Sequence, residues 1–196
     1  MAEQSTARGS RFTPLRAAQL YDAVLDLLRE VGYEALSMEA VATRARFSKA
    51  TLYRDWGGKP QLVAAAVEFR RPTRIDLIDT GSLRGDLYVM VEHADDNQLA
   101  RDAALQLSVG HAIYDNPELR RTLREVRLNP ALDDIGAILR RGVHRGEVAA
   151  DNPALDLVPP MLVSLIVARP LLSDTAMTQD DLRRSMEALV FPALGI

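Results

Sequence analysis

Apolar residues recur every three or four positions along most of the chain, which is the spacing of one face of an α-helix. The first such run follows Thr13 and Pro14, a hydroxyl residue and a proline in the order that opens helices. Gly32 ends the run, because glycine readily adopts the left-handed conformation found after helices. We therefore predict a helix over residues 14–31, with an apolar face made of Leu20, Val24, Leu27, Leu28 and Val31.

Three shorter helices are predicted directly after it. Ser37 and Ser48 each precede a short run with helical spacing, as N-cap residues do, and they predict helices over residues 38–45 and 49–56. Two consecutive glycines then separate the second of these from a helix over residues 59–70. Short helices joined by three or four residues are typical of a helix-turn-helix.

The rest of the chain shows a linker and six further helical runs, without a convincing strand. The linker covers residues 72–81, and Pro170 is expected to end or kink the fifth run. The first two runs cover residues 83–95 and 98–114, and the third and fourth begin at residues 117 and 130. The fifth covers residues 154–169, and the sixth begins after Thr178. We therefore predict an all-α protein with a disordered arm over 1–12, a helix-turn-helix domain over 13–71 and a larger helical domain over 72–196.

Composition and charge narrow the class of protein. Aromatic residues make up only 5% of the 196 residues, which favours helices over a β-sandwich. Cysteine is absent, which excludes disulfides and thiolate metal sites. No apolar run reaches the ~18 residues of a membrane span, and the first residues lack the apolar core of a signal peptide. We expect a cytoplasmic protein without membrane contact.

The net charge of −3 is unevenly distributed along the chain. Residues 1–71 carry 11 Lys and Arg against 8 Asp and Glu, a net charge of +3. Residues 72–196 carry 13 against 19, a net charge of −6. A basic N-terminal part on an acidic body suggests that only the N-terminal part meets an anionic partner.

The segment from Ser48 to Lys59 has the features of a DNA recognition helix. Such a helix needs small or polar residues in its first turn, which enters the major groove, and flanking groups that hold phosphates. Ser48 can cap the helix, whereas Leu52 is expected to face the core of the module. The predicted contacts to double-stranded DNA are Ser37, Ser48, Lys49, Ala50, Thr51, Tyr53, Arg54 and Lys59.

Residues 15–66 resemble the TetR family of bacterial repressors. The resemblance is carried by Gly32, by the helix over 38–45, by Ser48-Lys-Ala-Thr-Leu-Tyr53 and by Lys59-Pro-Gln-Leu62. It implies a homodimer in which the last two helices of each subunit form a four-helix bundle. We expect a repressor that leaves a palindromic operator when a small-molecule effector, still unknown, binds the helical domain.

Two residues depart from the family pattern. Arg46 stands where the family usually has glycine in the turn, so we expect a left-handed residue there at a cost of about 1 kcal/mol. Asp55 stands where the family often has a residue that contacts phosphate, and an aspartate would repel it. We therefore leave Asp55 out of the predicted contacts.

Residues for the effector and for dimerisation are predicted from the faces of the later helices. Two of the later helices carry more apolar residues than packing of a single face in the core of one subunit would explain. This excess indicates an interface with a second copy related by a two-fold axis. The predicted interface residues are Leu162, Leu165, Ile166, Met186, Leu189 and Val190. The predicted effector pocket mixes apolar walls with a few polar groups. It consists of Met90, His93, Leu107, His111, Tyr114 and Met161.

Other classes of function receive less support from the residues. His93, His111 and His144 lack the spacing of a helical zinc site, and no catalytic or nucleotide-binding motif occurs, so we expect no metal, no cofactor and no enzyme activity. Arg8 and Arg11 belong either to a soluble tail or to an arm that enters the minor groove. A helical ligand- or partner-binding protein with little sequence-specific DNA binding, and a small helical enzyme, remain as alternatives.

Overall fold

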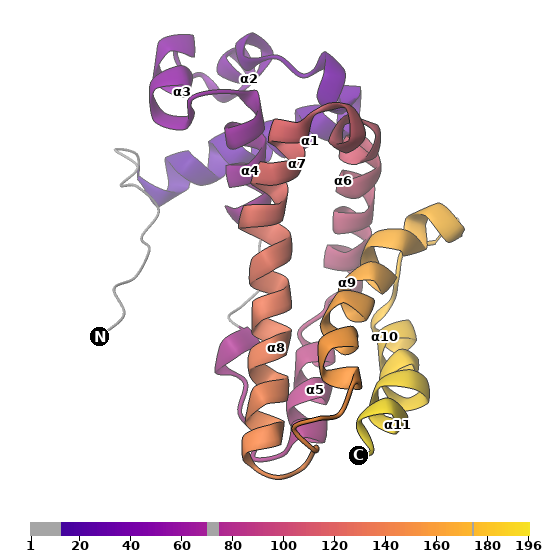
Figure 1. Ribbon diagram of the computed structural model, residues 1–196. Helices are drawn as coiled ribbons and strands as arrows, with labels where there is room; N and C mark the ends of the chain where they lie inside the picture. Colours follow the sequence, from indigo (N-terminus) through magenta and orange to yellow (C-terminus); the bar gives the residue numbers. More distant parts are fainter. Residues whose placement is uncertain (1–12, 70–74, 174) are drawn as a thin grey trace. The chain divides into compact units, whose positions relative to one another are not determined.

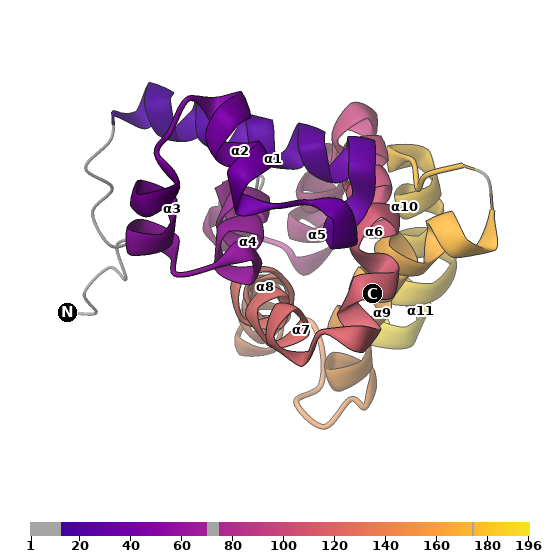
Figure 2. The same ribbon diagram turned by 90° about the horizontal axis from the view of Figure 1, so that it is seen from above.

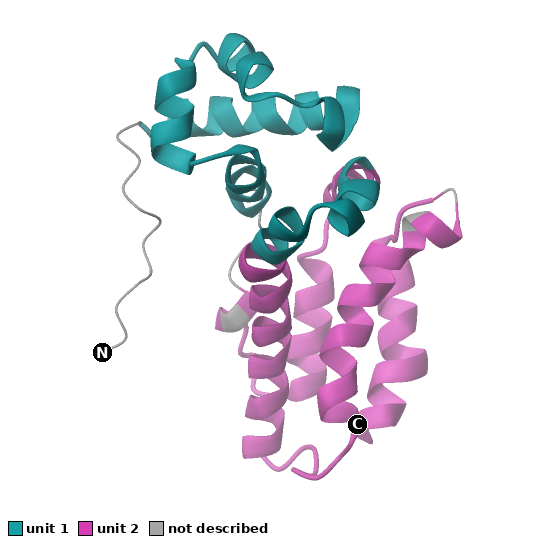
Figure 3. Cartoon of the chain, turned by 45° about the horizontal axis from the view of Figure 1, so that its top comes forward, with its two compact units in different colours: residues 1–70, 108–123 teal, residues 71–107, 124–196 magenta. Residues whose placement is uncertain are grey.

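The computed structural model describes residues 13–69, 75–173 and 175–196, and every regular element within these ranges is a helix. This confirms the all-α prediction. The predicted arm over 1–12, with Arg8 and Arg11, lies outside the described residues. The chain forms two compact units (Figure 3). Unit 1 comprises residues 1–70 and 108–123, and unit 2 comprises residues 71–107 and 124–196. Residues 108–123 thus pack with the N-terminal helices, although they follow the predicted boundary at residue 71.

Unit 1 contains the helix-turn-helix. Helix α1 packs against α2 and α4, and α3 contacts both α2 and α4 (Figure 2). Helix α7 also packs on α4. The helices of this unit are α1 (Pro14–Ala35), α2 (Met38–Ala45), α3 (Lys49–Trp56), α4 (Lys59–Phe69), the second part of α6 (Asp96–Asp115) and α7 (Pro117–Leu123).

The ends of these helices follow the predicted signals. The Oγ1 of Thr13 accepts a hydrogen bond from the main-chain nitrogen of Arg16, which is the geometry of an N-cap. Gly32 has φ of 74°, so the predicted stop is a break in α1 that is followed by one short turn to Ala35. The apolar face of α1 is buried at Leu20, Val24, Leu27 and Leu28, whereas Val31 is exposed.

Unit 2 is a bundle in which α8 packs against both α5 and α9, and α10 packs against α5 (Figure 1). Its core contains the fully buried Leu83, Leu87 and Ile138. Helix α9 runs to Leu172, so the predicted end at 169 was wrong: the main-chain nitrogen of Ser173 still donates to the carbonyl of Arg169 at 3.0 Å, so the helical turn continues past Pro170. The helices are η1 (Ile75–Leu77), α5 (Leu83–Glu92), the first part of α6, η2 (Arg124–Leu128), α8 (Asn129–His144), α9 (Ala154–Leu172), α10 (Gln179–Ser185), η3 (Met186–Val190) and α11 (Phe191–Leu194).

A buried carboxylate fastens the start of α5 to the end of α8. The side chain of Asp86 has no exposed surface. Its Oδ1 accepts hydrogen bonds from the main-chain nitrogen of Thr80 at 2.6 Å and from the Thr80 hydroxyl at 2.8 Å, and its Oδ2 accepts one from Arg145 at 2.9 Å. A buried charge is tolerated when it is paired and hydrogen-bonded in this way.

None of the helices in the described part of the chain is both long and apolar enough to cross a membrane.

Candidate functional site

Helix α3 presents its first turn to solvent. The Oγ of Ser48 accepts a hydrogen bond from the main-chain nitrogen of Thr51 at 3.0 Å and lies 2.7 Å from the Thr51 hydroxyl. Lys49 and Ala50 are exposed, and Leu52 is fully buried on the opposite side of the helix. The predicted N-cap and the predicted core residue are therefore both confirmed. This turn is free to enter a groove while Leu52 anchors the helix.

The start of α2 lies close to the start of α3. Ser37 caps α2, because its Oγ accepts a hydrogen bond from the main-chain nitrogen of Ala40 at 3.1 Å. In the first turn of α2, the carboxylate of Glu39 lies 3.7 Å from the ammonium of Lys49. Both side chains are exposed, so this pair holds Lys49 only weakly. The ammonium of Lys49 is thus available to an anionic partner.

The end of α3 carries an exposed tyrosine and a paired arginine. Tyr53 is 47% exposed, so its side chain is accessible from solvent, and its predicted phosphate contact stays a prediction. Arg54 lies against its neighbour Asp55, with Nε 2.8 Å from Oδ1 and Nη2 3.2 Å from Oδ2. The hydrogen bond to Asp55 raises the pKa of Arg54. Asp55 therefore offsets the charge of the predicted DNA contact Arg54.

Lys59 is directed into the module in the structure. Its Nζ donates hydrogen bonds to the main-chain carbonyls of Tyr33 at 2.9 Å and Glu34 at 3.4 Å, and lies 4.2 Å from the centre of the Tyr33 ring. Burial, together with the charges of Glu34 and Glu118, raises the pKa of Tyr33 to about 12. The phosphate contact of Lys59 stays a prediction. In the structure, its ammonium already donates to two main-chain carbonyls.

The turn between α2 and α3 has a contact that the sequence did not predict. Arg46 is left-handed, with φ of 55° and ψ of 46°, as its place in the turn predicted. Arg16 of α1 donates a hydrogen bond from Nη2 to the main-chain carbonyl of Arg46 at 2.7 Å, and its guanidinium lies 4.6 Å from the centre of the Phe47 ring. Arg16 is 30 residues from Arg46, and no spacing rule joins positions so far apart.

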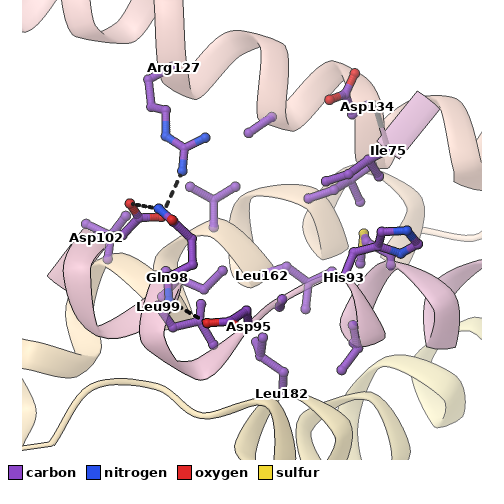
Figure 4. Close-up of a pocket in the computed structure, with 18 of the residues that line it drawn as sticks. Ile75, His93, Asp95, Gln98, Leu99, Asp102, Arg127, Asp134, Leu162 and Leu182 are labelled. Atoms are coloured by element: carbon purple, nitrogen blue, oxygen red, sulfur yellow. Dashed lines mark hydrogen bonds and ion pairs between the residues drawn. The ribbon is translucent and has the colours of Figure 1, made fainter. Parts of the chain in front are cut away.

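Unit 2 encloses a cavity of about 180 Å³. Apolar side chains from α5, α8, α9 and α10 form most of its wall, and polar side chains come from α6, η2 and α8 (Figure 4). The lining residues are Ile75, Met90, Val91, His93, Ala94, Asp95, Gln98, Leu99, Asp102, Gln106, Arg127, Leu128, Ala131, Asp134, Ile135, Leu162, Val163, Ile166, Val167, Leu182 and Met186.

An ion pair crosses the polar side of this cavity. Asp102 of α6 accepts hydrogen bonds from Arg127 of η2 at 3.2 Å and from the side chain of Gln98 at 2.8 Å (Figure 4). Asp95 caps α6 by accepting a hydrogen bond from the main-chain nitrogen of Gln98 at 2.9 Å. Because Asp102 and Arg127 offset each other, the cavity offers hydrogen-bonding groups beside an apolar wall. Sites for small organic molecules are usually built in this way.

Only two of the six predicted pocket residues line the cavity. They are Met90 and His93, and the structure places Leu107, His111, Tyr114 and Met161 elsewhere. The reason is the choice of helix face. Helix α6 turns Leu99, Asp102 and Gln106 to the cavity, whereas Leu107, His111 and Tyr114 lie on an exposed face, and Met161 packs against the core. The charged residues Asp102 and Arg127 were not predicted, because they are 25 residues apart and meet only through the packing of α6 and η2.

The predicted dimer residues need a similar correction. Leu162, Met186 and Val190 are buried within unit 2, so they cannot contact another subunit in this conformation. Leu165 and Ile166 are half-buried, Ile166 lines the cavity, and Leu189 is exposed. Helix α9 instead carries exposed residues at intervals of three and four, namely Leu157, Pro160, Ser164, Val167 and Leu171, of which Val167 also lines the cavity.

The three histidines do not meet in the structure. His93 lines the cavity, and its Nδ1 lies 2.7 Å from the carbonyl of Val89. His111 is exposed beside Asp115, at 3.3 Å, and His144 is also exposed. Among the residues described, no three His, Cys, Asp or Glu side chains are grouped closely enough to hold a metal ion.

Comparisons with known proteins agree with this geometry. Residues 20–66 match the family model for bacterial regulatory proteins of the tetR family, and residues 77–189 match that for a tetracyclin repressor-like C-terminal domain. An uncharacterised HTH-type transcriptional regulator of Mycobacterium tuberculosis is 34% identical over 198 residues, which cover 91% of this chain and 88% of that one. The DNA-binding transcriptional repressor TetR of Mycobacteroides abscessus is 33% identical over 137 residues, covering 69% and 72%.

A solved structure extends the similarity to the whole fold. The transcriptional regulator FadR of Bacillus subtilis, solved in complex with stearoyl-CoA, superposes with a TM-score of 0.67 at 21% identity, over 91% of this chain and 98% of FadR. The two family models cover both the helix-turn-helix and most of the helical body. We conclude that the chain belongs to the TetR family, whose members are DNA-binding transcriptional regulators and not enzymes.

Proposed function

We propose that the protein is a homodimeric repressor that acts in the cytoplasm and leaves a palindromic operator when a small molecule binds unit 2. The observation that carries the proposal is the first turn of α3, which is capped by Ser48, exposed at Lys49 and Ala50, and anchored by Leu52. A turn of this kind can bring side chains and main-chain N–H groups to base edges and phosphates. Repression is the activity named for the M. abscessus relative.

The exposed face of α9 supports the homodimer. Leu157 is 65% exposed and Leu171 is 76% exposed, and both lie on the face that includes Pro160 and Val167. Apolar residues at spacings of three and four suit packing against the same face of a second copy. A dimer would place two α3 helices on successive half-sites of one duplex. Sedimentation at micromolar concentration should show a dimer, and Leu157→Glu should shift it to a monomer.

The cavity supports control by a small molecule. Its apolar wall and its polar corner at Asp102 and Arg127 suit an organic ligand, and the FadR structure holds stearoyl-CoA within the same fold. Helix α6 lines the cavity through Leu99, Asp102 and Gln106, and the same helix continues into residues of unit 1. A ligand that favours one position of α6 would therefore favour one arrangement of the DNA-reading helices.

Ala50→Glu tests the proposal most simply. A carboxylate in the exposed first turn of α3 would face phosphates, so binding to a duplex selected from random DNA should fall by at least tenfold. Ala149→Glu is the matched control, because it adds the same charge at an exposed position of unit 2. Equal affinities of the two variants, measured by fluorescence anisotropy, would contradict DNA reading by α3.

The role of the cavity needs a separate measurement. The neutral apolar dye N-phenyl-1-naphthylamine should become fluorescent on binding, and Val163→Trp, which fills the cavity from α9, should remove that signal while operator binding stays. Dye binding that survives Val163→Trp would place the ligand outside this cavity.

A second candidate function rests on the pairing of Arg54 with Asp55. Because Asp55 offsets one predicted phosphate contact, the chain would then be a helical ligand-binding protein with little sequence-specific DNA binding. Failure of the wild-type protein to enrich any duplex, combined with dye binding to the cavity, would favour this function.

A further inference from the structure

The turn between α2 and α3 contains a strained residue. Arg46 is the only non-glycine residue with positive φ in the described ranges, and its Cβ makes that conformation unfavourable. The turn closes with hydrogen bonds from the main-chain nitrogen of Arg46 to the carbonyl of Thr43 at 3.3 Å, and from Phe47 to Ala42 at 2.9 Å. An L-residue stays in this region only when its surroundings hold it there.

Arg16, which lies outside the turn, makes contacts that can hold Arg46 in this conformation. It lies in the first turn of α1, and its Nη2 donates to the carbonyl of Arg46 at 2.7 Å. The same guanidinium lies over the ring of Phe47, 4.6 Å from its centre. Arg46 and Phe47 directly precede Ser48, which caps α3. One planar side chain therefore contacts both residues that set the path of the chain into the recognition helix.

A second contact joins α1 to the other end of the same helix. The rings of Tyr21 and Trp56 meet edge to face, with 6.1 Å between their centres. Tyr21 lies in α1, and Trp56 is the last residue of α3. Helix α1 thus makes two contacts around α3: Tyr21 meets the end of α3, and Arg16 meets the turn that precedes the start of α3. A rotation of the turn would change the position of α3 against Tyr21.

We propose that Arg16 is a positioning residue for DNA reading: it holds the left-handed turn at Arg46 and thereby fixes where α3 presents its first turn. The inference rests on the proposed function, since it assumes that α3 reads DNA. A binding element must be held to within about 0.5 Å to be effective, and contacts from neighbouring helices provide that precision. Arg16 needs no contact with DNA for this role.

The alternative role for Arg16 is a direct contact with phosphate, and the two roles predict different behaviour. A phosphate contact adds about one to the salt slope of binding, and lysine can replace arginine in it. A positioning role leaves the slope unchanged. It also requires the planar guanidinium, which stacks on a ring and donates a directed hydrogen bond, so lysine cannot replace it.

The test compares Arg16→Ala, Arg16→Lys, Arg46→Gly and the double variant Arg16→Ala/Arg46→Gly on a duplex selected from random DNA by the wild-type protein. Arg16→Ala and Arg16→Lys should each weaken binding about three- to tenfold, the loss expected for one hydrogen bond, with an unchanged salt slope. The double variant should return to within about twofold of wild type, because glycine adopts φ above zero without strain. Arg29→Ala is the control, an arginine of α1 that pairs only with the exposed Asp26 in the contacts described.

Two results would overturn the inference. One is an affinity of Arg16→Ala equal to that of Arg29→Ala. The other is a loss that glycine at position 46 does not restore, together with a salt slope lower by about one.

A readout without DNA separates this inference from the proposed function. Trp56 is the single tryptophan of the chain, so its indole NH gives one NMR signal at the end of α3. Arg16→Ala should shift that signal, and the added Arg46→Gly should return it towards its original position. An unchanged signal in Arg16→Ala overturns the positioning role, even if the wild-type protein selects no duplex at all.

Discussion

The ammonium group of Lys59 donates a hydrogen bond of 2.9 Å to the main-chain carbonyl of Tyr33, at the end of α1. The last carbonyls of a helix lack partners within the helix and carry partial negative charge, so a lysine there satisfies an acceptor and a dipole together. The contact with the Tyr33 ring adds a cation–π interaction. Lys59 thus links the start of α4 to the end of α1.

Lys59→Met should therefore lower the free energy of unfolding in urea by about 1.5–3 kcal/mol, the range of a hydrogen bond that involves a charged group. Lys49→Met is the matched control, because Lys49 is exposed and makes only a 3.7 Å pair with Glu39. It should change stability by less than about 0.5 kcal/mol but weaken DNA binding and lower its salt slope by about one. Unchanged stability of Lys59→Met, with a lower salt slope, would instead assign Lys59 to a phosphate.

Asp55→Asn should strengthen DNA binding. The change removes the carboxylate that pairs with Arg54 at 2.8 Å and leaves the guanidinium able to meet a phosphate. We expect affinity for DNA of any sequence to rise at low salt and the salt slope to steepen by about one. Asp151→Asn removes the same charge from an exposed position of unit 2 and controls for net charge. If both variants bind DNA more tightly, the gain comes from the change in net charge and not from the release of Arg54.

The pair of Asp86 and Arg145 should make stability depend on pH. Burial alone would raise the pKa of Asp86, but hydrogen bonds from Thr80 and Arg145 outweigh it, and the pKa is lowered. A lowered pKa in the folded state means that the stabilisation is present above the unfolded value of about 4 and is lost as pH falls through the folded value.

Asp86→Asn checks this by removing the buried carboxylate. Because Arg145 keeps Asp79 and Glu147 as partners, we expect a cost of about 1.5–3 kcal/mol at pH 7, the range of a hydrogen bond to a charged group. Urea unfolding should show that the free energy of unfolding falls less between pH 7 and pH 3 in the variant than in wild type. If it falls by the same amount in both, other carboxylates cause the acid sensitivity.

Local signals in the sequence predicted the helices well. Ser37, Ser48 and Thr178 each cap a helix as expected, since capping depends only on residues within one turn. The faces of the helices were harder to assign. Asp102 and Arg127 lie 25 residues apart and offset each other at the cavity, and this pairing depends on how α6 and η2 pack. Arg16 and Arg46 show the same limit within unit 1, because only the tertiary fold brings them together.

Gly142 should be intolerant of a larger residue. A methyl group at this position of α8 would lie 2.6 Å from a Cδ of Leu83 on α5, closer than packed carbon atoms come. Gly142→Ala should cost about 1–3 kcal/mol through overpacking. Gly110→Ala is the control, since its added methyl group meets nothing within 4 Å, and it should stabilise α6 by about 0.5–1 kcal/mol. Stabilisation by both substitutions would mean that α5 can move away from α8.

The most direct measurement of the central claim is selection of bound fragments from a random duplex library by the purified full chain. Reading by two α3 helices of a dimer predicts enrichment of a palindrome, with half-site centres about 10–10.5 base pairs apart or a multiple of that spacing. Ala50→Glu should enrich nothing from the same library. Absence of enrichment with the folded wild-type protein, or enrichment that survives Ala50→Glu, would contradict DNA reading by α3.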